Sequence, residues 1–349
     1  MRLILKKIAL PVLNSVDVAT YHLAQRKEAL RCLKSITEDV GGISRSNLKL
    51  CDEYALDVFK SKRYAPWLYV YCAVAREFKE GWIPDNYYRV HIVPKIKGKY
   101  GSLSLLKPLN SLLFHSANFP DILAFVNGKF IVPKTLEIPT GDIKSYLFKD
   151  HDRVVYKLDN SLQGRGIHVF TEKNFSIETV QLLGNGLFQS YITQHEDLAK
   201  FPSAAVSTLR LTTVLGKNGL PSVRGCYLRL GAANDKYVTS TTHIRVPLNL
   251  INGKMEGVGY TPDWKQIYEY PHDGCRFRGF QYPHYHEACS LVLTLHKKMP
   301  FVHSIGWDIC VDRHREVKIM EWNGAHNDIK FSEATQGPCF SDLGWEKIA

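Results

Sequence analysis

The chain has 349 residues, of which 45% are hydrophobic and 23% charged, a composition that excludes a disordered protein and leaves room for two or three subdomains with large cores. Its formal net charge of +11 at pH 7 favours binding of anions such as nucleotides, acidic glycans, nucleic acid or anionic lipid, without choosing among them. The eight cysteines form no CxxC pair and no disulfide framework, so we expect reduced thiols and a cytoplasmic protein.

Residues 1–13 are apolar and basic, but Lys6 and Lys7 interrupt them and no signal-peptide cleavage site follows. The segment is too short to span a bilayer and no later segment is long enough, so we expect no transmembrane segment. We interpret these residues as a helix that docks on its own domain. Weak binding to a membrane surface is the alternative.

The first hundred residues are predicted to be mainly helical. Apolar side chains recur at roughly helical spacing in three stretches: residues 16–35, 47–59 and 67–78. Gly41 and Gly42 break the chain between the first two, and Gly81 follows the third. From residue 89 onward the pattern changes to short β-like runs separated by proline and glycine, for example residues 89–94 and 129–139.

An eight-residue connection from Asp159 to Gly166 joins two β-rich runs and contains Ser161 and Gly164. Lys157 stands at the end of the first run. A glycine loop can bring backbone N–H groups close to phosphate oxygens, while a lysine on the adjoining strand adds a point charge. The pattern predicts a phosphate clamp, although it is neither a Walker A sequence nor a GxGxxG motif after a strand. An ordinary glycine hairpin is the alternative.

Residues 187–192 form an apolar strand that runs into polar residues. Its backbone, up to Ile192, can offer one donor and one acceptor to an adenine, and Gln189 can reach the exocyclic amine. His195 or Glu196 is then expected near the ribose hydroxyls. An ordinary strand that leads into a loop is the alternative.

Two short strands with period-2 alternation flank a charged turn late in the chain. A turn centred between His314 and Arg315 places Asp308 opposite Glu321, with Asn323 beside Glu321 on the same face. Because facing carboxylates next to an apolar wall need a compensating cation, the hairpin predicts a magnesium site. A solvated hairpin with acids on its wet face is the alternative.

The chain resembles the ATP-grasp superfamily, and specifically its sugar-transfer-associated branch. The resemblance lies in the order of three stretches: the lysine strand with its glycine loop, then the QSYI linker, then the IGWD…EWN hairpin. The segments QSYITQHEDLAKFPSAAVSTLRLTTV, CYLRLG and FRGFQYPHYHEACSLVLTLHKKMPFVHSIGWDI suggest this branch. The resemblance covers roughly residues 76–330, and the IGWD…EWN end is its most specific part.

The resemblance implies an α+β chain with the ATP-grasp fold, in which two α+β subdomains clasp a nucleotide. We therefore expect a mainly helical region over residues 1–98 and an ATP-grasp domain over residues 99–349. Within that domain, residues 110–190 would include the glycine-loop lid, and residues 200–349 would form the metal-binding subdomain.

The resemblance also implies roles for individual residues. Asp308, Glu321 and Asn323 correspond to the magnesium ligands, Arg210 to an arginine aimed at the transferring group, and Arg229 to its partner. The residues expected to bind ATP are Lys107, Lys157, Ser161, Gly164, Gly166, Gln189, Ile192, His195 and Glu196. Lys107 lacks the aspartate that usually precedes the second phosphate lysine, so Lys134 is a rival. Trp322 replaces a glycine that is more usual in the family, and it is expected to add bulk near the site.

The implied activity is ATP- and Mg²⁺-dependent ligation of a carboxylate to an amine through an acylphosphate. Its expected partners are a small-molecule carboxylate and an amine or sugar-linked acceptor, with an acidic glycan or nucleotide sugar as a further option in polysaccharide biosynthesis. One alternative is a kinase that phosphorylates a hydroxyl with the same machinery. Another, suggested by the net charge, is a non-catalytic protein that binds a polyanion. Nucleic acid is not favoured because aromatic residues rarely interleave the basic ones.

Overall fold

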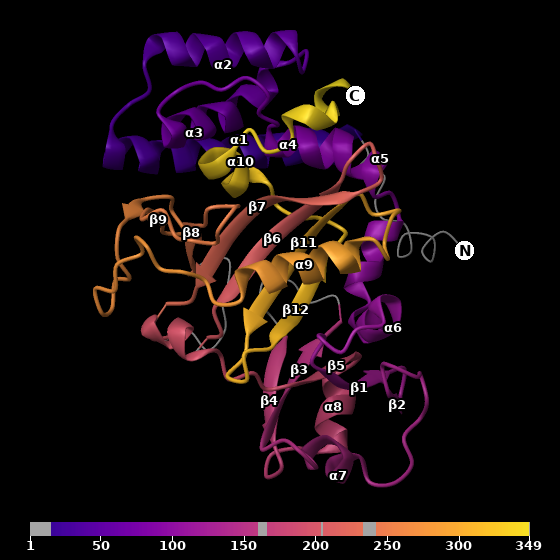
Figure 1. Ribbon diagram of the computed structural model, residues 1–349. Coiled ribbons are helices and arrows are strands. Elements are labelled where there is room, and N and C mark those ends of the chain that lie inside the picture. Colours follow the sequence, from indigo (N-terminus) through magenta and orange to yellow (C-terminus); the bar gives the residue numbers. More distant parts are fainter. Residues whose placement is uncertain (1–14, 160–165, 204, 233–241, 349) are drawn as a thin grey trace. The chain divides into compact units, whose positions relative to one another are not determined.

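The computed structural model describes residues 15–159, 166–203, 205–232 and 242–348 (Figure 1). The predicted N-terminal docking segment and the loop residues Ser161 and Gly164 lie outside the described residues. The chain divides into two compact units: unit 1 holds residues 1–99, 263–266 and 328–349, and unit 2 holds residues 100–262 and 267–327. None of the described helices has both the length and the hydropathy needed to cross a membrane.

Unit 1 is helical, and the three helices predicted there are confirmed. Its α-helices are α1 (Ser15–Val40), α2 (Arg45–Asp57), α3 (Ala65–Ala75), α4 (Asp85–Tyr87), α5 (Val93–Ile96) and α10 (Lys330–Gln336). α2 begins at a polar cap, where the N–H of Asn47 donates to Ser44 Oγ at 3.2 Å. α3 is apolar on nearly all sides and therefore forms the centre of this unit, with Trp67 stacked on Tyr71.

Residues 88–96 are helical, so the β-like run predicted at residues 89–94 is wrong. Tyr88–Ile92 is a π-helical turn, and α5 follows it directly. Burial recurs at every fourth residue, at Tyr88, Ile92 and Ile96, whereas Pro94 is exposed. A strand would bury every second residue, so packing of one helical face overrides the strand preference of these β-branched residues.

The C-terminal residues 328–349, which the sequence analysis assigns to the domain beginning at residue 99, belong to unit 1. Glu333 of α10 anchors them. The N–H groups of Ile83 and Cys339 donate to its two carboxylate oxygens at 2.8 and 2.7 Å, and Trp82 Nε1 donates to its backbone carbonyl at 2.9 Å. Burial raises the pKa of Glu333 to about 7. Backbone donors satisfy this carboxyl group, which indicates a structural role.

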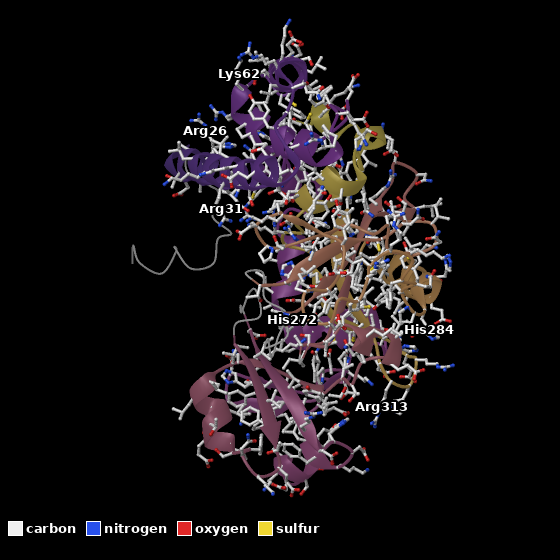
Figure 2. All side chains as sticks on the ribbon, turned by 90° about the vertical axis from the view of Figure 1, so that its left-hand side faces the viewer. Arg26, Arg31, Lys62, His272, His284 and Arg313 are labelled. Carbon is white, nitrogen blue, oxygen red and sulfur yellow. The ribbon has the colours of Figure 1, made fainter. Side chains whose placement is uncertain are left out.

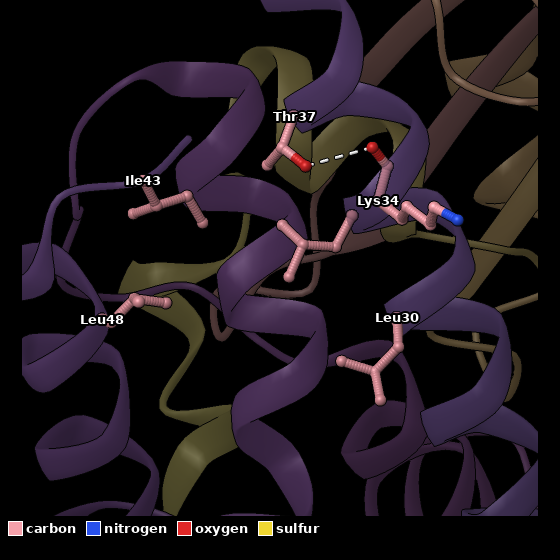
Figure 3. A pocket seen from close by; sticks show the side chains of 6 residues that line it. Leu30, Lys34, Thr37, Ile43 and Leu48 are labelled. Carbon is pink, nitrogen blue, oxygen red and sulfur yellow. Dashed lines mark hydrogen bonds between the residues drawn. The ribbon is translucent and has the colours of Figure 1, made fainter. Parts of the chain in front are cut away.

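An apolar hollow of about 300 Å³ lies between α1 and α2 (Figure 3). Its lining consists of Leu30, Leu33, Lys34, Thr37, Ile43 and Leu48. The hydroxyl of Thr37 donates to the backbone carbonyl of Lys34 at 3.0 Å and is therefore used within the helix. These lining residues include no carboxylate, histidine or thiol, and Lys34 is the one titratable side chain among them.

Basic side chains are exposed on both units. Figure 2 shows Arg26, Arg31 and Lys62 on unit 1 and Arg313 on unit 2, all at the surface. The positive charge of the chain is therefore not confined to one place, and it does not by itself locate a binding site.

The smaller sheet of unit 2 has the strand order β2-β1-β5-β3-β4, and its neighbouring strands pair antiparallel. The strands are β1 (Asp121–Val126), β2 (Lys129–Ile131), β3 (Arg153–Leu158), β4 (Ile167–Thr171) and β5 (Gly186–Ser190). One face packs on the helices α7 (Ile143–Phe148) and α8 (Ile177–Leu183). β3 and β4 flank the connection predicted as the glycine loop, and β5 is the predicted apolar strand.

The larger sheet of unit 2 has the order β10-β9-β8-β7-β6-β11-β12. The strands are β6 (Thr208–Leu215), β7 (Pro221–Leu230), β8 (Ile244–Pro247), β9 (Gly259–Tyr260), β10 (Gln266–Ile267), β11 (Ser304–Val311) and β12 (Val317–Asn323). Helix α9 (Tyr285–His296) covers one face, where Val292 and Leu295 join a core with Leu211, Trp307 and Trp322 (Figure 1). The other face is left for polar side chains.

The hairpin of β11 and β12 has the predicted pairing of Asp308 with Glu321, but for a different reason. Val311 pairs with Val317, so the turn is centred on His314, one half-residue earlier than predicted. That register alone would place Asp308 opposite Met320. A β-bulge between Asp308 and Ile309 shifts the register by one residue and restores the pair with Glu321.

Candidate functional site

Charged side chains gather on the face of the larger sheet that points away from α9. Asp308 lies opposite Arg210 of β6 on one side and opposite Glu321 of β12 on the other. Trp307 and Ile309, the neighbours of Asp308 in the chain, point to the opposite face and are fully buried in the core. Strand alternation therefore places the two carboxylates on the polar face and fixes the backbone beneath them.

Asp308 is held by two arginines. Arg210 donates from Nε to Oδ1 at 2.6 Å and from Nη2 to Oδ2 at 3.0 Å, and Arg229 Nη1 lies 3.2 Å from Oδ1. Gly306 leaves room for Arg210, because a Cβ atom there would lie 3.0 Å from its Nη1. Burial would raise the pKa of Asp308, but the charges of Arg210 and Arg229 hold it at about 2. Asp308 is therefore ionised and fixed in orientation.

Of the two facing carboxylates, Asp308 and Glu321, it is Glu321 that has no hydrogen bond or ion pair with the described residues. Burial and the charge of Asp308 raise its pKa, against the opposing charges of Lys157 and Lys107. Asn323 lies beside it and donates from Nδ2 to Asp308 Oδ2 at 3.3 Å. Glu321 thus bears a carboxylate charge that the protein itself does not compensate fully.

This donor set fits magnesium. Within the described part of the chain, no three His, Cys, Asp or Glu side chains gather in a way that could hold a metal ion on their own. Mg²⁺ needs only one or two protein carboxylates, because water and substrate phosphates complete its shell. Asp308 is already shared with two arginines, so Glu321 is the oxygen donor with the greatest need of a cation.

Two lysines approach the acids from the smaller sheet and its flanking segment. Lys157 of β3 donates from Nζ to the backbone carbonyl of Met320 at 3.1 Å, next to Glu321 in the chain. Lys107 is buried and donates from Nζ to the carbonyl of Leu158 at 3.2 Å. Burial lowers the pKa of Lys157, although the charges of Glu321 and other acids act to raise it. The two sheets thus place cations and carboxylates side by side.

A buried amide and carboxylate lie on the smaller sheet. Gln189 of β5 is 2% exposed and donates from Nε2 to Asp121 Oδ1 at 2.8 Å, while Ser111 Oγ donates to Oδ2 at 2.7 Å. The Oε1 atom of Gln189 is buried without a hydrogen-bond partner. Sequence reasoning selected Gln189 but missed Asp121 and Ser111. The available signal was weak: a lone acid after a proline at the start of an apolar strand.

Residues 118–342 match the family model described as sugar-transfer associated ATP-grasp. The chain belongs to the sugar-transfer associated ATP-grasp family. Its resemblance to ATP-grasp proteins, inferred from the sequence, is therefore confirmed, and so is the α+β ATP-grasp fold with its helical N-terminal region. No curated protein matches the chain.

Several solved ATP-grasp structures are similar to this chain at low identity. The biotin carboxylase domain of Hydrogenobacter thermophilus 2-oxoglutarate carboxylase, solved with MgADP, ADP and bicarbonate, has a TM-score of 0.41 and 14% identity over 69% of this chain and 44% of that chain. N5-carboxyaminoimidazole ribonucleotide synthetase from Thermotoga maritima has a TM-score of 0.35 and 10% identity over 72% and 49%, respectively. The ATP-grasp ligase PsnB, complexed with its minimal precursor, has a TM-score of 0.41 and 11% identity over 72% and 62%. The chain thus spans roughly half the length of these structures.

The remaining residues expected at the ATP-grasp nucleotide site lie in two places: Ile192, His195 and Glu196 in the linker after β5, and Gly166 just before β4. Ile192 and His195 are buried, and the N–H of His195 donates to the carbonyl of Val311 at 2.8 Å. Glu196 is exposed. Gly166 has a positive φ of 70° and its carbonyl accepts from Leu158 N–H at 3.0 Å, closing the connection between β3 and β4. The linker residues therefore lie at the end of β11 rather than at Asp308.

The expectation that Trp322 adds bulk to the ATP-grasp site is wrong. Trp322 pairs with Trp307 on the core face of the sheet and is 1% exposed. Its ring packs edge-on against Phe114, and its Nε1 donates to Asn110 Oδ1 at 2.8 Å. Because side chains alternate along a strand, a residue between Glu321 and Asn323 has to point away from both.

The structure favours Lys107 over Lys134 as the second lysine of the ATP-grasp site, and matched variants test this. Lys107 lies near Glu321 and Lys157, whereas Lys134 is exposed after β2. We expect Lys107→Met to raise the KM for ATP by about 10- to 100-fold, because one charge-assisted hydrogen bond to a phosphate is worth about 1.5–3 kcal/mol. Lys134→Met should leave KM unchanged. Steady-state ADP release measures both, and a larger effect at Lys134 would reverse the assignment.

Proposed function

We propose that this chain is an ATP- and Mg²⁺-dependent carboxylate–amine ligase that acts through an acylphosphate. One observation carries the proposal: Lys157 of the smaller sheet donates to the backbone of Met320 in the larger sheet, beside Glu321, whose charge the protein compensates only in part. Binding of a triphosphate requires basic side chains next to a metal ion. The hydrogen bond from Lys157 to Met320 supports this arrangement, because it places a lysine next to the proposed metal ligand Glu321.

The residues divide between nucleotide and metal. Gln189, with the backbone up to Ile192, would bind the base, and His195 or Glu196 would lie near the ribose. Lys157, Lys107 and the loop that ends at Gly166 would bind phosphate oxygens. Asp308, Glu321 and Asn323 would hold magnesium, which when bound supplies positive charge that neutralises the phosphates.

The reaction has two steps. An oxygen of the substrate carboxylate attacks the γ-phosphorus of ATP, the bond from that phosphorus to the β–γ bridging oxygen breaks, and ADP leaves with the bonding electrons. The amine nitrogen then attacks the acyl carbon of the acylphosphate, phosphate leaves, and the amine loses a proton. Arg229 is suited to the developing negative charge, since its Nε is buried and unpartnered while its Nη1 is anchored on Asp308. Arg210 forms a bidentate pair with Asp308 and would mainly hold the Asp308 carboxylate in its orientation.

We propose as substrates a small-molecule carboxylate and an amine or sugar-linked acceptor, in the synthesis of a polysaccharide that contains an acidic sugar. An acidic glycan or a nucleotide sugar would suit a chain with a net charge of +11. The name of the matching family model supports a role associated with sugar transfer. We place this activity in the cytoplasm, where ATP and reduced thiols are available.

An ADP-release assay tests the proposed function. Purified protein with magnesium and ATP would be screened against a panel of carboxylates, with and without amino sugars and uronic acids as acceptors. We expect ADP release that depends on one carboxylate, and formation of a hydroxamate when hydroxylamine replaces the amine. A kinase would instead form a stable phosphate ester and no hydroxamate. If the protein neither releases ADP nor binds ATP, both the ligase and the kinase are excluded, and the alternative of a non-catalytic polyanion-binding protein remains.

A further inference from the structure

Asp121 and Gln189 lie on the same face of the smaller sheet as Lys157. Gln189 is directly opposite Asp121 in β1 and opposite Val155 in β3, two residues before Lys157. The charge of Asp121 also acts to raise the pKa of Lys157. The amide and carboxylate therefore lie beside the lysine proposed for the phosphates, where a base would be bound.

The hydrogen bonds of this pair determine which end of the Gln189 amide faces Asp121 and which end faces away from it. An ionised carboxylate only accepts, so Asp121 binds the NH₂ group of Gln189 and the amide oxygen is turned away. The hydroxyl and the backbone N–H of Ser111 both donate to Asp121 and hold it in place. The Oε1 atom of Gln189, at the other end of the amide, is buried and unpartnered, which costs about 1–3 kcal/mol unless a ligand donates a hydrogen bond to it.

We propose that Asp121 is a positioning residue that makes the site select a 6-aminopurine over a 6-oxopurine. This inference rests on the proposed ATP-dependent function. The amino group of adenine donates to Gln189 Oε1, whereas the carbonyl of hypoxanthine would place a second acceptor against it. A site built to pair with one polar group discriminates strongly against an analogue that lacks it.

ATP and ITP provide a closely related pair of probes. They differ at position 6, which bears an amino group in ATP and a carbonyl in ITP, and at N1, which accepts a hydrogen bond in adenine and carries a hydrogen in hypoxanthine. Replacing Gln189 by leucine separates the contribution of position 6 from that of N1. Calorimetric titration of the purified protein with the magnesium salt of each nucleotide gives both Kd values without any requirement for turnover. We expect the wild-type chain to bind ATP at least tenfold more tightly than ITP.

Asp121→Asn should reverse the amide of Gln189. The backbone N–H of Ser111 can only donate, so the oxygen of the new asparagine stays on that side and its NH₂ group faces Gln189. The Gln189 oxygen then turns inward to accept, and its NH₂ group faces the base. We expect the ratio of Kd for ITP to Kd for ATP to fall at least tenfold, with ITP binding retained or strengthened.

If Asp121 has a purely structural role, Asp121→Asn should raise the Kd values for ATP and ITP by the same factor, and that result would overturn the inference. In the background of Gln189→Leu, Asp121→Asn should no longer change the ratio, because no amide remains to be oriented. Wild-type protein that binds ATP and ITP equally would overturn this inference alone. Wild-type protein that binds neither nucleotide would overturn the proposed function together with it.

Discussion

Replacing Asp308 by asparagine is expected to abolish ATP turnover and to lower the free energy of unfolding by about 3 kcal/mol. The substitution removes the charge that pairs with two largely buried arginines, Arg210 and Arg229. Breaking a buried ion pair from one side costs about 3–5 kcal/mol, since the remaining charge stays in the interior without compensation. The same carboxylate is also a proposed magnesium ligand, so activity and stability should fall together.

Chemical denaturation at several pH values measures this effect. The folded-state pKa of Asp308, about 2, lies below its ordinary value, so its contribution to stability is complete above about pH 4 and is lost as the pH falls toward 2. The difference in stability between wild type and Asp308→Asn should therefore narrow over that range. The double variant Arg210→Met with Asp308→Asn should lose less stability than the sum of the single variants. Equal stability of wild type and Asp308→Asn at pH 7 would contradict the buried pair.

Glu321→Gln is expected to reduce turnover at least 100-fold while the free energy of unfolding stays the same or rises. Glu321 has no hydrogen bond or ion pair within the described residues, and burial and Asp308 both raise its pKa. Its ionised form is therefore disfavoured in the folded state, and its charge reduces stability above the pKa of the unfolded chain. Glutamine keeps the shape and removes that charge. Loss of one preorganised electrostatic group at a reacting phosphate costs about 2.7–4 kcal/mol in the barrier.

The test measures ADP release, and thermal unfolding in the absence of nucleotide, for wild type, Glu321→Gln and Asp308→Asn purified in parallel. If Asp308→Asn loses stability, Glu321→Gln gains it and both lose turnover, then Asp308 contributes to stability and activity whereas Glu321 contributes to activity alone. Magnesium should raise the unfolding temperature of wild type in the presence of ATP and have little effect on Glu321→Gln. A marked loss of stability in Glu321→Gln would show that an unidentified partner holds this side chain, and normal turnover would refute its role as a ligand.

Strand alternation predicted the paired carboxylates because it depends only on residues close together in the chain. It places Asp308, Glu321 and Asn323 on one face and Trp322 on the other, as observed, whereas the expectation of bulk near the site came only from comparison with the family. The bulge that sets their register has no sequence signal of comparable strength. The pairing was therefore correct although the position of the turn was not.

Other features depend on contacts between distant parts of the chain. Residues 89–94 have strand-forming side chains but pack as a helix, because Tyr88 and Ile92 lie on one buried face. Asp121 meets Gln189 only when β1 pairs with β5, far along the chain. Lys107 is separated from Lys157 by fifty residues of sequence, and only folding brings both to Glu321. No local pattern contains these relationships.

The bulge in the hairpin of β11 and β12 couples the length of the turn to the register of the two acids. Its extra residue offsets the half-residue displacement of the turn, so neither can change alone without moving Glu321 out of line with Asp308. A natural relative whose turn is one residue longer, with the same number of residues between the two acids, should therefore lack the bulge. Joint variation of turn length and bulge among relatives would show selection for the facing position of the two acids.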